Sequence, residues 1–245
     1  MWTDAIELRN FYSDALGTVA SRMIGKRIRN LWPNVVGMEV LGLGFVTPYL
    51  GIFQSEASRV IAAMPAGQGA LHWPNEGSGQ ATLVDETELP FADISINRVL
   101  LVHAMESTDN LRPMLREVWR VLTSGGRLIV VVPNRQGIWS RFESTPFGRG
   151  LPYSFRQLST MLIENLFTPT QSESALFIPP TRSRMMLSSA LAIEEIGHRW
   201  LTAFAGVTIM EATKKIYAAN AQTKTKRSIV HLPQHGTRIT TREEL

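Results

Sequence analysis

Apolar residues along this chain change their spacing from block to block, and each spacing predicts a different kind of element. Over residues 4–31 they recur every three or four positions, which predicts two helices broken near Gly17, with Asp4 as the first N-cap. Residues 35–43 and 59–64 are short continuous apolar runs that end in glycine or proline. Such runs are typical of buried parallel strands joined by a crossover.

The middle of the chain continues this alternation more clearly. Short apolar runs at residues 81–84, 98–103 and 128–132 predict three further strands. Between the last two runs, apolar positions 111, 115, 118 and 122 predict a helix that ends at Gly125 and Gly126. Strands that alternate with helices indicate the α/β class, here a doubly wound, Rossmann-like sheet of about seven mostly parallel strands under a helical N-terminal cover.

The last third of the chain has a weaker pattern. Helices are expected over residues 155–166 and 192–204, and a strand over 207–212 that pairs with or runs into residues 214–219. No element is assigned to most of the Ser- and Pro-rich stretch 172–191. We therefore expect an N-terminal helical cover (1–34), one main domain (35–219) and a basic tail (220–245) that is disordered.

Composition narrows the chemistry. The chain has 245 residues, of which 44% are hydrophobic, so it can bury one sizeable core. It has no cysteine, which excludes disulfides and thiolate zinc sites, and we expect no metal. The net charge is +4 and the pI is near 9.7, but no RNA-binding module accompanies the basic residues, so a nucleic-acid partner is not expected.

Neither end of the sequence nor its interior predicts contact with a membrane. The first residues include acidic ones and lack the apolar core of a signal peptide. No apolar run approaches the roughly 20 residues that span a bilayer. We expect a soluble, cytoplasmic protein.

Two consecutive stretches carry a resemblance to a known family. VDETELPFADISINRVLLVHAMES (Val84 to Ser107) combines a strand, an acidic residue, Leu-Pro-Phe and a buried strand that ends in His-x-x-Glu. LREVWRVLTSGGRLIVVVPNR follows it and ends at Arg135. In this order the two stretches resemble the class I S-adenosylmethionine (SAM) methyltransferases, particularly the small-molecule branch of the type 11 kind.

The resemblance implies a set of cofactor-binding residues. In EVLGLGFVTPYL, Gly42 and Gly44 match the first glycines of the family's cofactor loop, although a tight strand-to-helix turn explains them equally well. Asp85 matches the residue whose carboxylate accepts the adenine amino group, with Glu86 beside it, and its alternative is a turn or cap aspartate. Trp73 is expected to cover the adenine face, with plain packing as its alternative.

His103 ends the fourth predicted strand, where the family lines its methyl-transfer site. A histidine there can orient a substrate or take a proton, since its ordinary pKa lies near neutrality. The alternative is a structural histidine that holds a neighbouring carbonyl. Glu106, three residues later, either pairs with His103 or caps the next helix.

Two positions depart from the family pattern. Val46 stands where a third glycine is usual, and its β-carbon restricts the space beside the methionine part of SAM. Met64 and Pro65 occupy the strand tip where the family has a carboxylate for the ribose hydroxyls. Glu76, in the next loop, is the alternative source of that carboxylate.

Two functions remain open. The first is a SAM-dependent methyltransferase that acts on a small molecule, with His103 near the substrate. The second is a catalytically inactive methyltransferase-fold protein that serves as a subunit or regulator of a partner enzyme, because Val46, Met64 and Pro65 weaken the cofactor site and the fold alone does not establish catalysis. An RNA methyltransferase ranks behind both.

Overall fold

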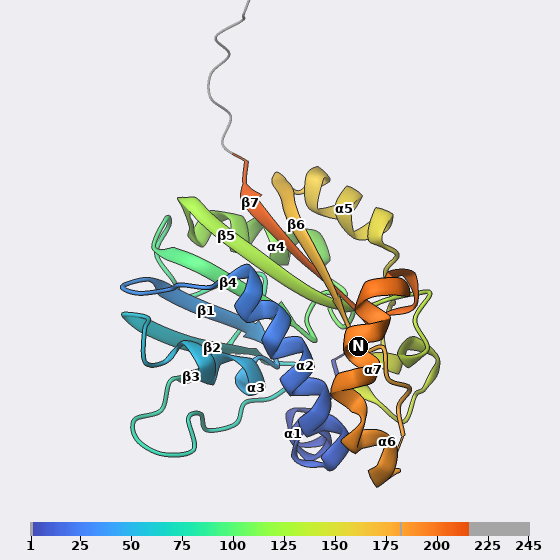
Figure 1. Ribbon diagram of the computed structural model, residues 1–245. Helices are drawn as coiled ribbons and strands as arrows, with labels where there is room; N and C mark the ends of the chain where they lie inside the picture. The colour runs from blue at the N-terminus through green and yellow to red at the C-terminus, as the bar shows by residue number, and fades with distance from the viewer. Residues whose placement is uncertain (1, 182, 216–245) are drawn as a thin grey trace, which may run out of the picture.

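The computed structural model describes residues 2–181 and 183–215, and within them seven strands form one sheet (Figure 1). The strand order is β3-β2-β1-β4-β5-β7-β6, and β7 alone runs opposite to the other six strands. The predicted doubly wound, mostly parallel sheet is confirmed. The strands are β1 (Glu39–Gly44), β2 (Arg59–Pro65), β3 (Ala81–Val84), β4 (Ile96–Val102), β5 (Leu122–Pro133), β6 (Phe167–Ala175) and β7 (Val207–Lys214).

Helices cover both faces of the sheet (Figure 1). One face carries α2 (Ala15–Leu31), α3 (Thr47–Leu50) and α7 (Ala190–Trp200), and the other carries α4 (Leu111–Val121) and α5 (Phe155–Glu164). Alternate residues of each central strand enter the two apolar layers, which explains why these strands read as continuous apolar runs. The short α1 (Ala5–Ser13) and α6 (Arg184–Ser188) complete the set.

The N-terminal helices form as expected, but the break between them lies at Asp14 instead of Gly17. Asp4 caps α1, because its carboxylate accepts from the backbone N–H groups of Ile6 and Glu7. Gly17 lies inside α2 and is buried against α1. A β-carbon at Gly17 would fall 1.9 Å from the carbonyl oxygen of Phe11, so this glycine allows the two helices to pack closely.

Further elements differ from the sequence prediction. α4 ends at Val121 instead of at Gly125 and Gly126, because β5 begins at Leu122 and contains both glycines. β6 was not predicted because it is an edge strand with few buried positions, and Pro169 falls at an irregularity in its pairing. β1 begins at Glu39, after a turn in which Gly37 has a φ of 68°. The C-terminal helix starts earlier and ends at Trp200, followed by a 3-10 turn. Residues 216–219 and the predicted tail 220–245 lie outside the described residues.

A buried carboxylate joins α2 to the three strands at one side of the sheet. Glu211 of β7 is fully buried and accepts from Trp32 Nε1 (3.1 Å), Arg127 (3.1 Å) and the Thr170 hydroxyl (2.8 Å). These partners come from the end of α2, from β5 and from β6. One side chain therefore holds the antiparallel β7 in register with its neighbours.

We expect Glu211→Ala to lower the free energy of unfolding by about 2–4 kcal/mol, because it leaves buried donors and the Arg127 charge without their acceptor. Urea unfolding followed by circular dichroism measures the change. Glu164→Ala, which removes an exposed carboxylate 3.6 Å from Arg112, is the control and should stay close to wild type. Equal stability of the Glu211→Ala variant and wild type would contradict this role.

Candidate functional site

The candidate site lies where β1 and β4 end side by side. From β1 the chain passes to β2 and β3 on one side, whereas β4 leads to β5 on the other, so the strand order reverses here. Ligands of such sheets bind in the crevice at the carboxyl ends of the strands at this point. Gly44 pairs with Val102 at the end of the ladder, and Phe45 and His103 follow directly.

Both glycines of the β1 loop are used for close packing within the chain. Gly44 has a φ of 96°, and a β-carbon there would lie 2.3 Å from the Val102 carbonyl oxygen, which also accepts from the backbone N–H of Phe45. A β-carbon on Gly42 would lie 2.3 Å from a methyl carbon of Val46. Val46 is fully buried in the core layer beneath α2. The structure thus displays the tight-turn role of these glycines, and their cofactor role stays a prediction.

A chain of polar side chains crosses the crevice. The Tyr12 hydroxyl of α1 lies 2.9 Å from the Tyr49 hydroxyl and 2.8 Å from Nε2 of His103. Nδ1 of His103 lies 3.2 Å from a carboxylate oxygen of Glu106. The ring of Tyr12 also stacks on Phe45, with ring centroids 5.7 Å apart. We call these five residues the crevice cluster.

The crevice cluster fills the space between the strand ends. Phe45, Tyr49, His103 and Glu106 are each at most 4% exposed. The Phe147 ring lies against His103, with centroids 5.0 Å apart. The His103 ring is therefore enclosed between Tyr12 of α1 and Phe147.

The hydrogen bonds of the crevice cluster form a continuous chain from Tyr49 to Glu106. In the neutral tautomer with the proton on Nδ1, His103 donates to Glu106, its Nε2 accepts from the Tyr12 hydroxyl, and Tyr12 accepts from Tyr49. Burial raises the pKa of Tyr12 and of Tyr49 well above their usual value, so both hydroxyls stay protonated and can donate. The contact between His103 and Glu106 is one of the two roles predicted for Glu106 from the sequence, whereas Tyr12, Phe45 and Tyr49 were not predicted.

The backbone at His103 is also unusual. Its φ of 51° lies in the left-handed region, which is costly for a residue with a β-carbon. Its carbonyl oxygen lies 3.5 Å from the buried side-chain amide nitrogen of Gln68. Among the described residues, Oε1 of Gln68 and Oε2 of Glu106 are buried without a hydrogen-bond partner. Two unsatisfied acceptors next to His103 indicate a polar site that the closed packing does not fully satisfy.

The two acidic residues after β3 lie in different surroundings. Asp85 is exposed, and its carboxylate accepts from the backbone N–H (2.8 Å) and the hydroxyl (2.7 Å) of Thr87, which lowers its pKa. Glu86 is buried and accepts from the Thr108 hydroxyl at 3.1 Å. Glu86 therefore ties the loop after β3 to the loop after β4, whereas Asp85 stabilises its own turn.

The loop after β2 holds the remaining predicted residues. Trp73 is buried in the core layer beneath α2 and borders an open groove of about 480 Å³ that also touches Tyr12 and Phe45. At the tip of β2, the Met64 sulfur lies 3.2 Å from the backbone nitrogen of Leu71, and Pro65 follows. Glu76 is exposed in the loop. The structure therefore places no carboxylate at the tip itself.

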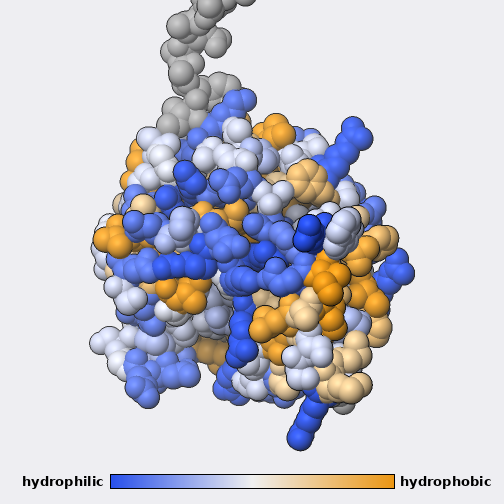
Figure 2. All heavy atoms as spheres, viewed as in Figure 1, coloured by the Kyte–Doolittle hydropathy of each residue, from blue (hydrophilic) through white to orange (hydrophobic). Residues whose placement is uncertain are grey.

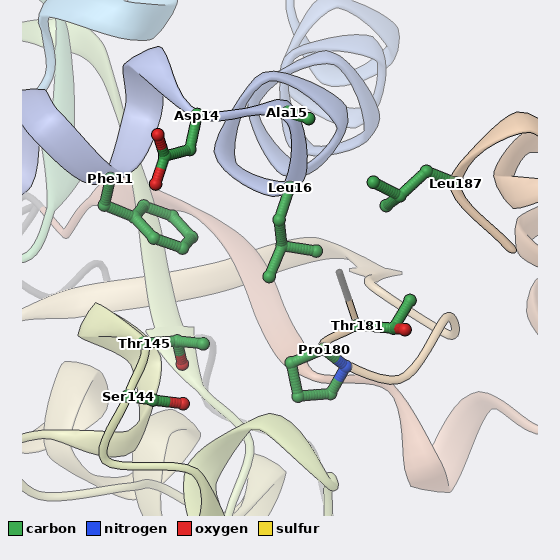
Figure 3. Close-up of a pocket in the computed structure, with 9 residues that line it drawn as sticks. All are labelled: Phe11, Asp14, Ala15, Leu16, Ser144, Thr145, Pro180, Thr181 and Leu187. Carbon is green, nitrogen blue, oxygen red and sulfur yellow. The ribbon is translucent and has the colours of Figure 1, made fainter. Parts of the chain in front are cut away.

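A separate pocket of about 330 Å³ lies between the α1–α2 junction and α6 (Figure 3). Phe11, Leu16 and Leu187 approach it from the helices, and Thr145 and Pro180 approach it from loops. We call it the α1–α6 pocket. Its lining residue Phe11 contacts Phe147, whose other neighbour is His103, so two aromatic rings separate the pocket from the crevice.

Within residues 2–181 and 183–215, no three or more His, Asp or Glu side chains are grouped so that they could hold a metal ion. No helix within the same ranges is long and apolar enough to cross a bilayer.

The raised tyrosine pKa values predict alkaline destabilisation. Tyr12 and Tyr49 favour the neutral form in the folded state more than in the unfolded state, where the pKa is about 10. Their stabilising effect is therefore complete below pH 10 and is lost as the pH rises above it. Thermal melting between pH 8 and pH 11 should show this fall, with a smaller fall for Tyr12→Phe. Phenolate absorbance that shows every tyrosine ionising at the usual pKa would contradict the buried cluster.

Comparison with known sequences places the middle of the chain in a known group. Residues 42–130, from β1 into β5, match the family described as Methyltransferase domain. A curated protein of Bacillus subtilis (strain 168), "Putative methyltransferase YrhH", is 32% identical over 63 residues. This match covers 26% of the chain and only 35% of the length of that relative.

Solved structures extend the likeness to most of the chain. One is a chain of the complex between the Haloferax volcanii Trm112 methyltransferase activator and a putative methyltransferase, with a TM-score of 0.59 and 14% identity over 88% of this chain and 95% of that one. Another is a SAM-dependent methyltransferase of Thermotoga maritima, described as a possible histamine N-methyltransferase. Its TM-score is 0.56, with 15% identity over 84% of this chain and 94% of that one. At these identities the likeness shows a shared fold.

Proposed function

Because residues 42–130 match the family described as Methyltransferase domain and the sheet has the strand order described above, we propose that the chain is a class I methyltransferase that transfers a methyl group from SAM to a small-molecule acceptor. The observation that carries this proposal is the position of the His103–Glu106 pair. It lies at the carboxyl end of β4, at the point where the strand order reverses. A pair of this kind can accept a proton at Nε2 while Glu106 orients the ring through Nδ1.

The cofactor roles follow from the family match and are part of the proposal. Gly42 and Gly44 provide the backbone of the loop after β1, and Asp85 and Glu86 follow β3 on the side expected for adenine. Trp73 borders the groove next to the loop after β1. When bound, SAM supplies the activated methyl group, and the protein aligns the acceptor with it and excludes water.

In the conformation described, the Tyr12 hydroxyl engages Nε2 of His103, so this nitrogen is not available to an acceptor. Tyr12 comes from α1, whereas the other members of the cluster follow β1 or β4 directly in the sequence. The contacts of α1 include a backbone hydrogen bond from Ala5 to Gln68, an ion pair from Glu7 to Arg149, and packing of Leu8 near Phe45. We infer that α1 moves away when SAM binds, which frees Nε2 of His103.

The size of the α1–α6 pocket supports a small acceptor. Its volume of about 330 Å³ falls at the lower end of the range for small-molecule sites. Phe11 is part of α1 and separates this pocket from Phe147. The same movement of α1 that exposes His103 would therefore open the pocket toward it.

The comparisons do not favour the alternative of an inactive subunit of a partner enzyme, since the similar solved structures include a SAM-dependent methyltransferase. The packing of Tyr12 on His103 and Phe45 is nevertheless the observation that this alternative would explain. Direct binding of the cofactor distinguishes the two.

Isothermal titration of SAM and S-adenosylhomocysteine into the full chain tests the proposal. Tyr12→Ala removes two hydrogen bonds and a ring stack that hold the crevice closed, so it should bind about 10-fold more tightly than wild type. Tyr12→Phe keeps the ring and should fall between the two. Circular dichroism checks that each variant is folded. If folded wild type and folded Tyr12→Ala both fail to bind at millimolar ligand, the proposal is wrong and the alternative stands.

A further inference from the structure

The surface helix α7 buries small and charged residues and exposes large apolar ones. Its buried positions are Ala190, Glu194 and Gly197, which are small or charged. Ile193 packs against the core, but the other large apolar residues face outward, with Ile196 62% and Trp200 73% exposed. A surface helix normally points its apolar stripe at the core.

The orientation of α7 is fixed by specific contacts. The carboxylate of Glu194 accepts from the backbone N–H groups of Leu176 (3.0 Å) and Phe177 (2.8 Å). A β-carbon on Gly197 would fall 2.3 Å from the Phe177 side chain, so only glycine allows this close approach. Rotating the helix to bury Trp200 would leave two buried N–H groups unpaired. The outward apolar face is therefore a property of the fold.

The apolar surface continues beyond the helix. Leu201 and Phe204, in the turn after α7, are also at least half exposed, and Figure 2 shows orange side chains gathered over this region. Beside them lies a shallow groove of about 160 Å³ between Phe177 and the outer side of α7. We call Ile196, Trp200, Leu201, Phe204 and this groove the α7 face. Contiguous apolar surfaces of this kind mark interaction sites.

The charges on α7 indicate what covers this face. Glu195 and Arg199 lie one turn apart on its exposed side and have opposite signs. Glu195 is paired with Lys26 of α2, and the Arg199 guanidinium lies over the Trp200 ring. An exposed carboxylate on this side of α7 does not suit an anionic lipid headgroup. It does suit a surface that repeats the same two charges in the opposite order.

We propose that the α7 face pairs with the α7 face of a second copy of this chain. In a two-fold symmetric dimer, both copies contribute the same surface patch, so the patch must be complementary to itself. A protruding side chain on one copy then requires a groove on the patch of the other, and an acidic residue requires a basic one. The α7 face has both: Trp200 protrudes beside the groove, and an antiparallel pairing of two α7 helices brings Glu195 of one copy toward Arg199 of the other. This pairing does not depend on whether the protein transfers methyl groups.

Sedimentation velocity of the full chain across micromolar concentrations tests the pairing. Wild type should be a dimer, and Trp200→Glu and Ile196→Glu should each weaken dimerisation at least about 30-fold, because buried aromatic and aliphatic anchors dominate such interfaces. Leu83→Glu, at a residue 54% exposed on β3, the edge strand at the opposite end of the sheet from β6, is the control and should dimerise as wild type does. A monomer at every concentration, or a dimer that both α7 variants leave intact, would overturn the proposal.

A charge exchange tests the orientation of the pair. Glu195→Arg and Arg199→Glu should each weaken dimerisation, because each places like charges opposite one another across the two-fold axis. The double variant restores the complementary charges and should recover the dimer. Failure of the double variant to recover it would overturn the antiparallel pairing. Cosedimentation of wild-type monomer with anionic phospholipid vesicles would assign the α7 face to a lipid surface instead.

Discussion

The proposed function depends on the hydrogen bond between the Tyr12 hydroxyl and Nε2 of His103. It joins the N-terminal helix α1 to the end of β4, across the point where the sheet reverses its order. Because Tyr12 also stacks on Phe45 and reaches Tyr49, one side chain closes the crevice from above. The nine-residue helix α1 therefore carries the side chain that engages Nε2 of His103.

The rest of the crevice is consistent with this closed arrangement. Gly44 brings the β1 loop against the Val102 carbonyl, and Val46 packs on Gly42, so the loop is held close to the sheet. The acceptor oxygens of Gln68 and Glu106 remain unsatisfied beside His103. A site that carries buried polar atoms without partners is costly unless another state satisfies them.

Local sequence pattern predicted the centre of the fold because each central strand is covered on both faces and therefore reads as an unbroken apolar run. β6 was not predicted because it is an edge strand with few buried positions, so its sequence shows no apolar run. The break at Asp14 was misplaced because glycine was taken as a helix stop, whereas Gly17 serves close packing of one helix on another. Such packing is a tertiary contact that no local period reveals.

The same distinction separates the site residues that were predicted from those that were missed. His103 and Glu106 are three positions apart at the end of one strand, so their proximity follows from local sequence. Tyr12 lies 91 positions from His103, and in the sequence it is one polar-aromatic residue on an amphipathic helix. Contacts over such separations are set by how α1 crosses the strand ends. No motif in the sequence encodes that crossing.

Hydrogen–deuterium exchange of the backbone amides of residues 5–13, with and without SAM, tests most directly whether α1 controls access to the crevice. If α1 moves away when the cofactor enters, its amides should exchange faster with saturating SAM, while those of β1 and β4 become more protected. If SAM binds and the amides of α1 keep or increase their protection, the helix does not have to move, and the account given for the crevice is wrong.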